Sequence, residues 1–527
     1  MKKILISDSV DKKAVAILQD AGFEVSYKPG MKKEELLNEV SQYNCLIVRS
    51  ATKVTPDVVE KMNSMEVIGR AGAGVDNIDI PSATRKGIIV MNTPGGNTVS
   101  TAEHTMALLL TMCRNTAQAN QSLRQGRWDR KLYQGTELSG KILGIIGLGK
   151  IGREVAVRAK AFDMKVIGYD PVLSNDVASQ LDVSLTDMDN IFAQSDIITV
   201  HVPMNDETKD LISKESIAKC KDGVKIINCA RGGIVNEKDI VEALNSGKVS
   251  AAAFDVYTSE PPDFSSELIQ HPKVVTTPHL GASTDEAQEK VAIQIAEQIV
   301  DLFNDKPLRG AVNASAFGGT ISKEIEPYID LGEKLGKIHA QLIKGQLKQI
   351  NINYSGQLLH ASTSILSVSV LKGFLSKMMS EAVNFINAPV IAKEMGVVIN
   401  ETKSGANSTY RNLMSVEFIS DKEKRFFAGT VIGNNELRLV DIDHFTLELK
   451  PEGNMIFYSN IDKPGMLATV GKILADANVN IAGLSLGRKE VGKNALTAIS
   501  VDSEVEENVI QKISSISGVD NVFYVKA

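Results

Sequence analysis

The chain has 527 residues, of which 43% are hydrophobic and 23% charged, and a net charge of −6. At roughly 150 residues per domain, this length predicts about three or four domains with ample hydrophobic core. The acidic balance argues against a nucleic-acid polymer as the main partner, and no apolar run approaches the ~18 residues that cross a bilayer.

The four cysteines have no spacing typical of a metal site or a disulfide framework. Cys45, Cys113, Cys220 and Cys229 form no CxxC pair and have no histidine partners at zinc-finger intervals. Residues 1–8 enter a strand pattern directly and lack the features of a signal peptide. We therefore expect reduced thiols, a cytoplasmic location, no membrane partner and no metal.

The amino-terminal hundred residues alternate short apolar runs with amphipathic helical patterns. Residues 4–7 and 45–48 read as buried strands, and residues 12–20 and 32–40 as helices between them. Alternation of this kind predicts a parallel sheet with helices on both faces.

Two capping-box patterns then predict helix starts on either side of a second βα series at residues 141–279. Residues 100–103 (Ser-Thr-Ala-Glu) should begin a helix to about residue 113. Residues 283–286 (Ser-Thr-Asp-Glu) should open a helix to about residue 304. The small and polar segment 312–320 is expected to be a linker.

The remaining residues no longer show the regular alternation of strand and helix patterns. Residues 320–452 show strands such as 349–354 and 437–440 but no chemical motif. The last ~75 residues follow the order β-α-β-β-α-β, which is the ferredoxin-like split βαβ arrangement. The expected strands are 455–459, 481–486, 495–501 and 522–525, and the expected helices are 466–477 and 506–515.

A glycine-rich turn predicts a dinucleotide site. The apolar strand 142–146 runs into residues 147–152 (Gly-Leu-Gly-Lys-Ile-Gly), a helix follows, and the next strand ends in Asp170. Gly147 permits the tight turn, Gly149 lets backbone approach a diphosphate, and Gly152 lets helix and strand pack closely. A lone motif also fits a purely structural turn, but the complete order favours dinucleotide binding. Asp170 would repel a 2′-phosphate, so NAD is favoured over NADP.

Three ionisable residues follow strand patterns further along the chain. Arg231, Glu260 and His279 come after the apolar runs 224–228, 251–256 and 274–278. Because carboxyl ends of strands line the cofactor crevice of a doubly wound sheet, we expect the three side chains to converge. Taken singly, each residue also fits a surface charge, a loop acid or a packed histidine.

The three residue types suit oxidation of a 2-hydroxy acid. His279 is the candidate base for the hydroxyl proton. Glu260 would bond to the other ring nitrogen and raise the pKa of His279. Arg231 offers a planar fork for the substrate carboxylate.

The chain resembles the D-isomer-specific 2-hydroxyacid dehydrogenase family over roughly its first 315 residues. The segments 147–152, 229–233 (Cys-Ala-Arg-Gly-Gly) and 278–284 (Pro-His-Leu-Gly-Ala-Ser-Thr) are similar to the family's signatures. The resemblance implies a substrate-binding domain of residues 1–98 and 286–315, with residues 99–285 inserted as the NAD-binding domain. It implies that Arg231, Glu260 and His279 are catalytic. Together with the three glycines, it implies cofactor contacts from Lys150, Ile151, Asp170, Cys229, Ala230, Arg231, Asp255, His279, Leu280, Gly281 and Ala282.

The substrate is predicted from cationic residues of the amino-terminal region. Arg49, Lys53 and Arg70 suit a second anionic group beyond the carboxylate, and Asn97 ends a turn able to bind an anion. Ordinary surface charges are the alternative interpretation. Segments 69–77 and 92–97 resemble substrate loops of phosphoglycerate dehydrogenases, a branch of the family. Arg130 lies in a segment, 128–131, that resembles a loop able to reach a neighbouring subunit's site; the alternative for Trp128 is a packed surface aromatic.

The carboxyl-terminal module resembles the ACT domain, which binds amino acids between paired copies. In residues 460–465, Pro464 suits a first helical turn and Asp462 can engage free N–H groups there. In phosphoglycerate dehydrogenases the usual ACT ligand is serine. The resemblance implies regulatory contacts from Asn460, Asp462, Pro464, Gly465, Asn480 and Ile481. Residues 318–452 resemble the intervening domain of that branch and residues 454–527 the ACT domain. Lys403, Arg411 and Lys422 in the intervening region fit either an anion site or a solvated face, and the solvated face is favoured.

The fold expected is α/β, with two Rossmann-like doubly wound parallel-sheet domains, an α+β intervening domain and a ferredoxin-like ACT domain. The resemblance implies NAD-dependent oxidation of 3-phospho-D-glycerate to 3-phosphohydroxypyruvate, the first step of L-serine biosynthesis, in a homodimer or homotetramer with serine as effector. Two alternatives stay open at this point. One is another D-2-hydroxyacid dehydrogenase, such as a glyoxylate or hydroxypyruvate reductase. The other is a non-catalytic NAD-sensing co-repressor.

Overall fold

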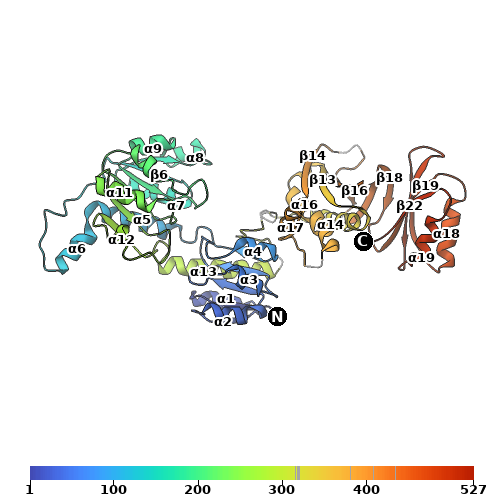
Figure 1. Cartoon of the computed structure of the whole chain (residues 1–527), viewed down its shortest axis with the longest axis horizontal. Helices are drawn as coiled ribbons and strands as arrows, with labels where there is room; N and C mark the ends of the chain where they lie inside the picture. The colour runs from blue at the N-terminus through green and yellow to red at the C-terminus, as the bar shows by residue number, and fades with distance from the viewer. Residues whose placement is uncertain (305, 315, 317–320, 380–381, 407–408, 434) are drawn as a thin grey trace.

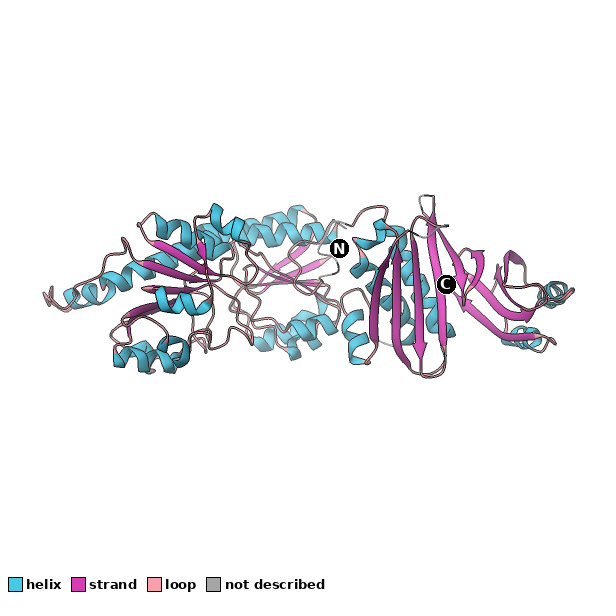
Figure 2. Ribbon diagram, turned by 90° about the horizontal axis from the view of Figure 1, so that it is seen from above, coloured by secondary structure: helices cyan, strands magenta, loops and turns pink. Residues whose placement is uncertain are grey.

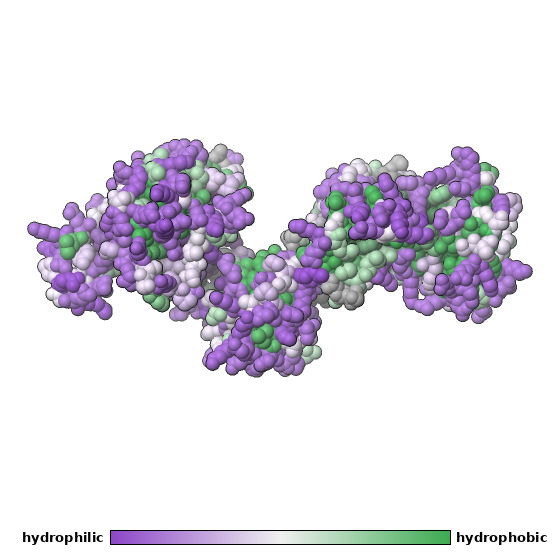
Figure 3. All heavy atoms as spheres, in the orientation of Figure 1, coloured by the Kyte–Doolittle hydropathy of each residue, from purple (hydrophilic) through white to green (hydrophobic). Residues whose placement is uncertain are grey.

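The computed structural model describes residues 1–527 apart from 305, 315, 317–320, 380–381, 407–408 and 434. Four sheets follow one another through the molecule, each with helices packed against it (Figures 1 and 2). The surface in Figure 3 is mainly hydrophilic, with hydrophobic atoms confined to scattered patches. In the described part of the chain, no helix is long and apolar enough to span a membrane.

The first sheet is parallel and has the order β2-β1-β3-β4-β5. Its helices cover both faces, as the alternation of apolar and amphipathic segments predicts. The long helix α13 (Asp285–Phe303) returns to this sheet, where Ile295 packs so closely on Gly69 that a Cβ there would lie 2.9 Å from Ile295 Cγ1. The elements are β1 (Lys3–Ile6), α1 (Lys12–Asp20), β2 (Glu24–Tyr27), α2 (Lys33–Glu39), η1 (Val40–Gln42), β3 (Cys45–Val48), α3 (Pro56–Glu60), β4 (Val67–Arg70), α4 (Ile80–Arg85) and β5 (Ile89–Met91).

The second sheet is parallel, with the order β12-β11-β10-β9-β6-β7-β8. Its strand order reverses between β6 and β9, which makes the carboxyl ends of these two strands a topological switch point. The elements are α6 (Thr116–Arg124), β6 (Ile142–Ile146), α7 (Lys150–Lys160), β7 (Lys165–Tyr169), α8 (Asn175–Gln180), β8 (Ser184–Leu185), α9 (Met188–Gln194), β9 (Ile197–Val200), α10 (Lys214–Ala218), β10 (Val224–Asn228), α11 (Glu237–Ser246), β11 (Val249–Phe254), α12 (Glu267–Gln270) and β12 (Val274–Thr276).

Two helices, α5 (Thr98–Arg114) and α13, connect the first two sheets, and α5 begins earlier than predicted. The expected capping box at 100–103 is wrong, because Asn97 is the N-cap and the Ser100 and Thr101 hydroxyls are buried within the helix. These hydroxyls donate instead to the Gly281 carbonyl oxygen at 2.9 and 3.1 Å. At the start of α13 the N-cap is Thr284, whose Oγ1 accepts a bond from Ala287 N at 3.2 Å.

The expected linker at 312–320 begins later than predicted. Val312 N donates to Val90 O at 2.7 Å, and the Asn313 side chain accepts from Val90 N at 2.8 Å. These bonds tie the segment to β5, so it belongs to the first sheet. The remainder of the expected linker at 315 and 317–320 lies outside the described residues.

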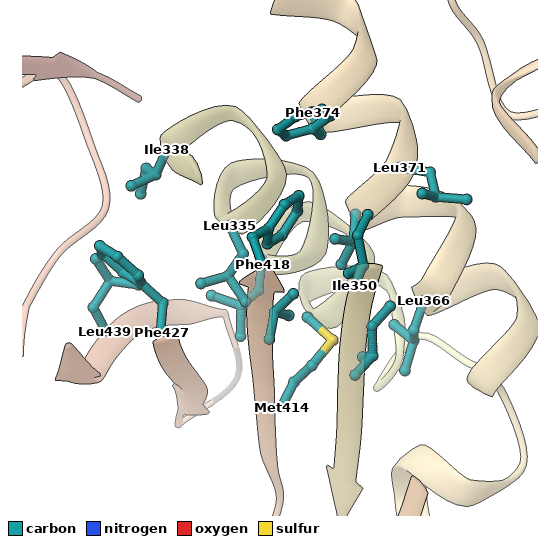
Figure 4. Packing of buried hydrophobic residues seen from close by; sticks show 14 of the residues in the cluster. Leu335, Ile338, Ile350, Leu366, Leu371, Phe374, Met414, Phe418, Phe427 and Leu439 are labelled. Atoms are coloured by element: carbon teal, nitrogen blue, oxygen red, sulfur yellow. The ribbon is translucent and has the colours of Figure 1, made fainter. Parts of the chain in front are cut away.

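The third sheet is mixed, with the order β14-β13-β15-β16-β17-β18; only the β13–β14 pair is parallel. Helices α14 and α16 cover one face, and Figure 4 shows Leu335 and Phe374 from these helices packed over Phe418 and Met414 of the sheet. The elements are α14 (Glu326–Leu342), β13 (Leu347–Ser355), α15 (Gln357–His360), α16 (Thr363–Met378), α17 (Ala388–Glu394), β14 (Val398–Ser404), β15 (Leu413–Ser420), β16 (Lys424–Ile432), β17 (Glu436–Ile442) and β18 (Phe445–Leu449).

The fourth sheet is antiparallel, with the order β20-β21-β19-β22 and the predicted βαββαβ succession. Its core continues into the third sheet, because Phe427 and Phe457 meet edge to face with ring centroids 6.3 Å apart. The α/β fold class with two doubly wound sheets, a mixed sheet and a ferredoxin-like module is therefore confirmed. The elements are β19 (Asn454–Ile461), α18 (Met466–Asp476), β20 (Ile481–Arg488), β21 (Asn494–Val501), α19 (Glu507–Ser514) and β22 (Val519–Lys526).

Candidate active site

The glycine-rich turn lies at the switch point of the second sheet, between β6 and α7. Gly147 has φ +94°, and a Cβ there would lie 2.5 Å from the His201 carbonyl oxygen. A Cβ at Gly152 would lie 2.0 Å from Gly147 O, so this position allows helix and strand to touch. A Cβ at Gly149 would meet nothing within 4 Å. Packing thus requires the outer two glycines, and open space lies over the middle one, as diphosphate binding needs.

The amino terminus of α7 and Asp170 complete a surface that fits a dinucleotide. No side chain caps the first turn of α7, so its N–H groups and dipole favour an anion. Asp170 accepts backbone bonds from Leu148, Val172 and Leu173, each at 2.9 Å. Burial alone would raise the pKa of Asp170, but these three bonds outweigh it and hold the pKa below its usual value. The carboxylate is therefore charged where ribose hydroxyls would bind.

Asp255 holds the turn that carries His279. Its side chain is 1% exposed and accepts from Leu280 N at 2.7 Å and from Gly281 N at 2.8 Å. It also accepts from Thr277 Oγ1 at 2.6 Å and lies 3.1 Å from His104 Nε2. Both carboxylate oxygens are thus turned toward protein donors. Sequence reasoning did not single out His104, because nothing local shows that α5 brings it to the end of β11.

His279 and Glu260 form an ion pair at the ends of β12 and β11. His279 Nδ1 lies 2.7 Å from Glu260 Oε2, and Tyr257 N donates to Glu260 Oε1 at 3.2 Å. The bond to Glu260 raises the pKa of His279 above its ordinary value despite partial burial. Burial would raise the pKa of Glu260, but the bond to His279 outweighs it, so this pKa is lowered. Because Nδ1 is engaged, Nε2 is the ring nitrogen that can take a substrate proton.

Arg231 follows β10 and bridges to the first sheet. Its Nε lies 3.0 Å from Asp76 Oδ2, and its Nη1 donates to Ala230 O at 2.7 Å. A Cβ at Gly74 would lie 2.1 Å from Arg231 Nη2, so the Gly74 backbone lies directly against the guanidinium. A Cβ at Gly232 would lie 1.9 Å from Tyr257 O, which places the turn after Arg231 tightly beside the Glu260 segment.

A cleft of about 590 Å³ joins these residues to cations of the first sheet. Its lining includes Lys53 and Arg70 together with Arg231, Glu260 and His279. Burial, and then the charge of Arg231, lowers the pKa of Arg70 to about 10. Arg70 is still protonated at neutral pH, so three cations face the same cleft as the His279–Glu260 pair.

Three residues expected at the substrate site, Arg49, Asn97 and Arg130, are not among the residues that line this cleft. Arg49 donates through Nη1 to Ser9 O at 3.1 Å and does not line the cleft. The Asn97 amide donates to Thr101 Oγ1 at 3.2 Å at the start of α5. Arg130 is exposed in the segment after α6, which projects from the rest of the molecule (Figure 1), and Trp128 in this segment is 76% exposed.

The other expected cofactor residues lie around the glycine-rich turn. Lys150 Nζ donates to Pro94 O of the opposite region at 3.2 Å, while Ile151 is half-buried. Cys229 is buried, and burial raises the pKa of its thiol to about 12, so the thiol is uncharged at neutral pH. Ala230 and Ala282 are half-buried and Leu280 is exposed at the same edge of the sheet. All four cysteines are free, and no cluster of metal-ligating side chains occurs among the described residues.

The expected effector turn of the fourth sheet differs from its prediction. Gly465, with φ +91°, is the N-cap of α18, so Pro464 precedes the helix and is not in its first turn. Asp462 accepts from Arg488 Nη1 at 2.9 Å and Gly492 N at 3.3 Å and not from the helix.

The asparagines of this module also make internal bonds. The Asn460 side chain is buried and donates to Ile461 O at 2.9 Å. The Asn480 side chain donates to Asp502 at 2.6 Å, and Ile481 next to it is exposed.

Comparison with known proteins decides the family. Residues 106–281 match the D-isomer specific 2-hydroxyacid dehydrogenase NAD binding domain, 324–443 the D-3-phosphoglycerate dehydrogenase intervening domain, and 454–518 the ACT domain. The D-3-phosphoglycerate dehydrogenase of Archaeoglobus fulgidus is 41% identical over 99% of this chain and 100% of that protein. The chain belongs to the D-3-phosphoglycerate dehydrogenase family. The Bacillus subtilis member of this family is 40% identical over 99% of both chains.

Solved structures resemble the first two sheets. The glyoxylate reductase from Paecilomyes thermophila is 28% identical, with a TM-score of 0.55, and covers 59% of this chain and 98% of that one. The D-lactate dehydrogenase of Aquifex aeolicus, solved with NAD and lactic acid, is 28% identical with a TM-score of 0.51 over 58% and 96%. The family is thus that of NAD-dependent dehydrogenases, and the second sheet is its NAD-binding domain.

Proposed function

We propose that this protein oxidises 3-phospho-D-glycerate to 3-phosphohydroxypyruvate with NAD, the first step of L-serine biosynthesis. The observation that carries the proposal is the cleft in which Lys53, Arg70 and Arg231 face the His279–Glu260 pair. The substrate carries a carboxylate and a phosphate, and cations from both sheets match these two anions. The D-3-phosphoglycerate dehydrogenases that align over the whole chain support the same substrate.

His279 acts as the acid–base residue. In the oxidation, neutral His279 takes the proton of the C2 hydroxyl on Nε2, while Glu260 stabilises the imidazolium that results. NAD, when bound over the glycine-rich turn, supplies the hydride acceptor for C2. Because the pKa of His279 is raised, the protonated form persists to higher pH, which suits the reverse reduction. Oxidation by contrast gains rate as pH rises through this raised pKa.

The cations divide between the two ends of the substrate. Arg231, next to the His279–Glu260 pair, orients the carboxylate and the oxygen on C2. Lys53 and Arg70 lie on the first sheet and would bind the phosphate. Glycerate lacks the phosphate, so it would leave these two cations unpaired and bind more weakly.

The test is NADH formation with 3-phosphoglycerate, compared with D-glycerate and D-lactate. We expect the highest kcat/KM for the phosphorylated acid. Good activity on glycerate and none on 3-phosphoglycerate would instead favour a glyoxylate or hydroxypyruvate reductase. NAD binding without turnover of any acid would favour a non-catalytic NAD-sensing co-repressor.

We further propose the division into a substrate-binding domain (1–98 and 286–315), an NAD-binding domain (99–285), an intervening domain (318–452) and an ACT domain (454–527). The buried and unpaired cysteines support a cytoplasmic location. The ACT match supports serine as effector, because an ACT domain is a module that binds amino acids between paired copies. The same pairing supports a homodimer or homotetramer. A serine titration of the initial rate and a solution mass measurement test these two proposals.

A further inference from the structure

Asn77 lies in the segment after β4 and lines the catalytic cleft beside the cations Lys53 and Arg70. Its half-buried side chain makes three hydrogen bonds. Oδ1 accepts from Arg70 Nε at 3.0 Å, and Nδ2 donates to Arg49 O and to Thr52 O, each at 2.7 Å. Both donors of the amide are thus occupied, so Asn77 acts on an anionic substrate only through its neighbours.

The three partners determine which way round the amide of Asn77 stands. Carbonyl oxygens only accept hydrogen bonds and Nε of an arginine only donates, so Nδ2 must face the two carbonyls and Oδ1 must face Arg70. A carboxylate at this position would set an oxygen atom against two carbonyl oxygens. An apolar side chain would make none of the three bonds. Among side chains of this size, an amide satisfies all three partners.

Arg70 is oriented by its bond to Asn77. This bond engages the single N–H of Nε and fixes the plane of the guanidinium, which carries the other four N–H groups. A Cβ at Gly72 would overlap Arg70 Nη1, so the Gly72 backbone lies directly against that end of the guanidinium. Asn77 and Gly72 therefore set the direction from which Arg70 can meet a phosphate.

Lys53 is placed by the same residue, through the loop that follows β3. Nδ2 of Asn77 binds the carbonyl oxygen of Thr52, which precedes Lys53 in the chain. On the other side of Lys53, Val54 N donates to Asn77 O and Asp79 N donates to Val54 O, both at 2.8 Å. The backbone of Lys53 is thus held on both sides.

A buried carboxylate holds the same loop by its donors, where Asn77 holds it by carbonyl oxygens. Asp8 is 3% exposed and accepts from Arg49 N and from Thr52 Oγ1, each at 2.6 Å. The loop after β3 is therefore fixed at two separate points. Because the Asp8 bonds do not involve Asn77, loss of the amide should shift the loop without unfolding it.

We propose that Asn77 is a positioning residue that sets the spacing of Lys53 and Arg70 and thereby selects a 2-hydroxy acid that carries a phosphate. The inference rests on the proposed function, because it needs these two cations to bind the phosphate. One amide bonded to both elements fixes their spacing before the ligand arrives, which lowers the entropy cost of binding. Arg231 at the carboxylate end is held separately by Asp76, so Asn77 should affect the phosphate end alone.

The test compares Asn77→Leu with the wild type on 3-phosphoglycerate and on D-glycerate. Leucine keeps the branched shape of asparagine and makes none of the three bonds. We expect KM for 3-phosphoglycerate to rise about tenfold with kcat nearly unchanged, because binding is lost equally in the ground state and the transition state. The kcat/KM for D-glycerate should hardly change. Inorganic phosphate, added as a competitor of 3-phosphoglycerate, should lose potency in the variant.

Three further variants separate positioning from general damage. Asn63→Leu, at an exposed asparagine after α3, is the matched control and should leave all values unchanged. Asn77→Ser is too short to make the three bonds and adds no apolar group, so it gives the same test if leucine prevents folding. In Arg70→Gln the preference for the phosphorylated acid is already reduced. Adding Asn77→Leu there should cost a smaller factor than in the wild type, whereas independent damage would multiply.

The outcomes distinguish this inference from the proposed function. If the wild type oxidises D-glycerate as well as 3-phosphoglycerate, the proposed function fails and the inference fails with it. If the wild type prefers 3-phosphoglycerate and the Asn77 variants keep that preference, the inference alone is overturned. Equal losses on both substrates would show general damage to the cleft and would also overturn it.

Discussion

The Asp76 carboxylate of the first sheet lies 3.0 Å from Nε of Arg231, which follows β10 of the second sheet. This ion pair links the two sides of the catalytic cleft. It uses Nε of the guanidinium, whereas Nη1 donates to Ala230 O. Arg231 is thereby fixed with Nη2 against the Gly74 backbone. Asp76 is thus a positioning residue for Arg231.

We predict that Asp76→Ala lowers kcat/KM for 3-phosphoglycerate about tenfold, equivalent to ~1.4 kcal/mol, because Arg231 then samples other orientations. NAD affinity should stay unchanged, since Asp76 lies in the turn after β4 of the first sheet and not on the NAD-binding domain. Steady-state kinetics and an NAD titration measure the two quantities. Asp57→Ala, which removes an exposed acid on helix α3 beside the same sheet, is the control. A higher kcat/KM in Asp76→Ala would show that Asp76 competes with the substrate instead.

The pH dependence should follow the His279–Glu260 pair. Glu260 raises the pKa of His279. In Glu260→Gln this pKa should fall toward the ordinary ~6.5 of histidine. Oxidation needs neutral His279, so the acid limb of its kcat/KM profile should move to lower pH. Reduction needs protonated His279, so its rate above pH 7 should drop.

Profiles of kcat/KM against pH in both directions check this prediction. Glu267→Gln, an exposed acid at the start of α12, serves as the control and should leave both profiles in place. An acid limb that does not move in Glu260→Gln would mean that another group sets the apparent pKa.

Removal of the imidazole separates chemistry from binding. His279→Ala should abolish turnover and leave NAD affinity almost intact, because the proposed dinucleotide contacts of the glycine-rich turn and Asp170 do not involve this side chain. Stopped-flow detection of NADH and an NAD titration report the two effects. A large loss of NAD affinity would contradict the assignment of His279 as the base.

Much of this site could be predicted from the sequence because it depends on local order and on topology. The turn at 147–152 follows a strand and opens a helix, and helix α1 has the bounds that its periodicity predicts. Arg231, Glu260 and His279 lie at strand ends, and a doubly wound sheet brings such ends together. The structure places all three in one cleft, and their catalytic roles stay predictions.

The missed features depend on contacts between distant segments. Asp76 and Arg231 are 155 residues apart, and His104 and Asp255 are 151 apart, so no pattern links them. The sequence also shows that a cationic residue is present but not which way its side chain points. Arg49 was expected in one cationic pocket with Arg70, and its charge reaches Arg70, but its Nη1 donates to Ser9 O. The hydroxyls of Ser100 and Thr101 match a capping box in sequence, but tertiary contact with Gly281 O determines where they lie.

Asp255 should be essential for the geometry of the His279 turn. Asp255→Ala leaves Leu280 N, Gly281 N and Thr277 Oγ1 without their acceptor, and each unpaired buried donor costs about 1–3 kcal/mol. We expect kcat to fall at least a hundredfold. The temperature at which the enzyme is thermally inactivated in the presence of NADH should also fall. Asp263→Ala, at an exposed loop acid after the same strand, should change neither quantity. Retained kcat in Asp255→Ala would show that the turn keeps its shape without this carboxylate.

The Asp462–Arg488 ion pair leads to a prediction about the proposed effector. Arg488 Nη1 lies 2.9 Å from the Asp462 carboxylate, which is the acceptor that the ammonium group of serine would need at this turn. Serine must therefore displace Arg488 in order to pair with Asp462. Arg488→Gln removes this competitor, so the serine concentration for half-maximal inhibition should fall severalfold, while activity without serine stays unchanged. Because both pairs are exposed and screened by salt, added salt should weaken the serine response in the variant and have little effect in the wild type, where one ion pair replaces another. Lys472→Gln, a lysine on helix α18 of the same domain, is the matched control. An unchanged serine response in Arg488→Gln would show that Asp462 does not receive the ammonium group.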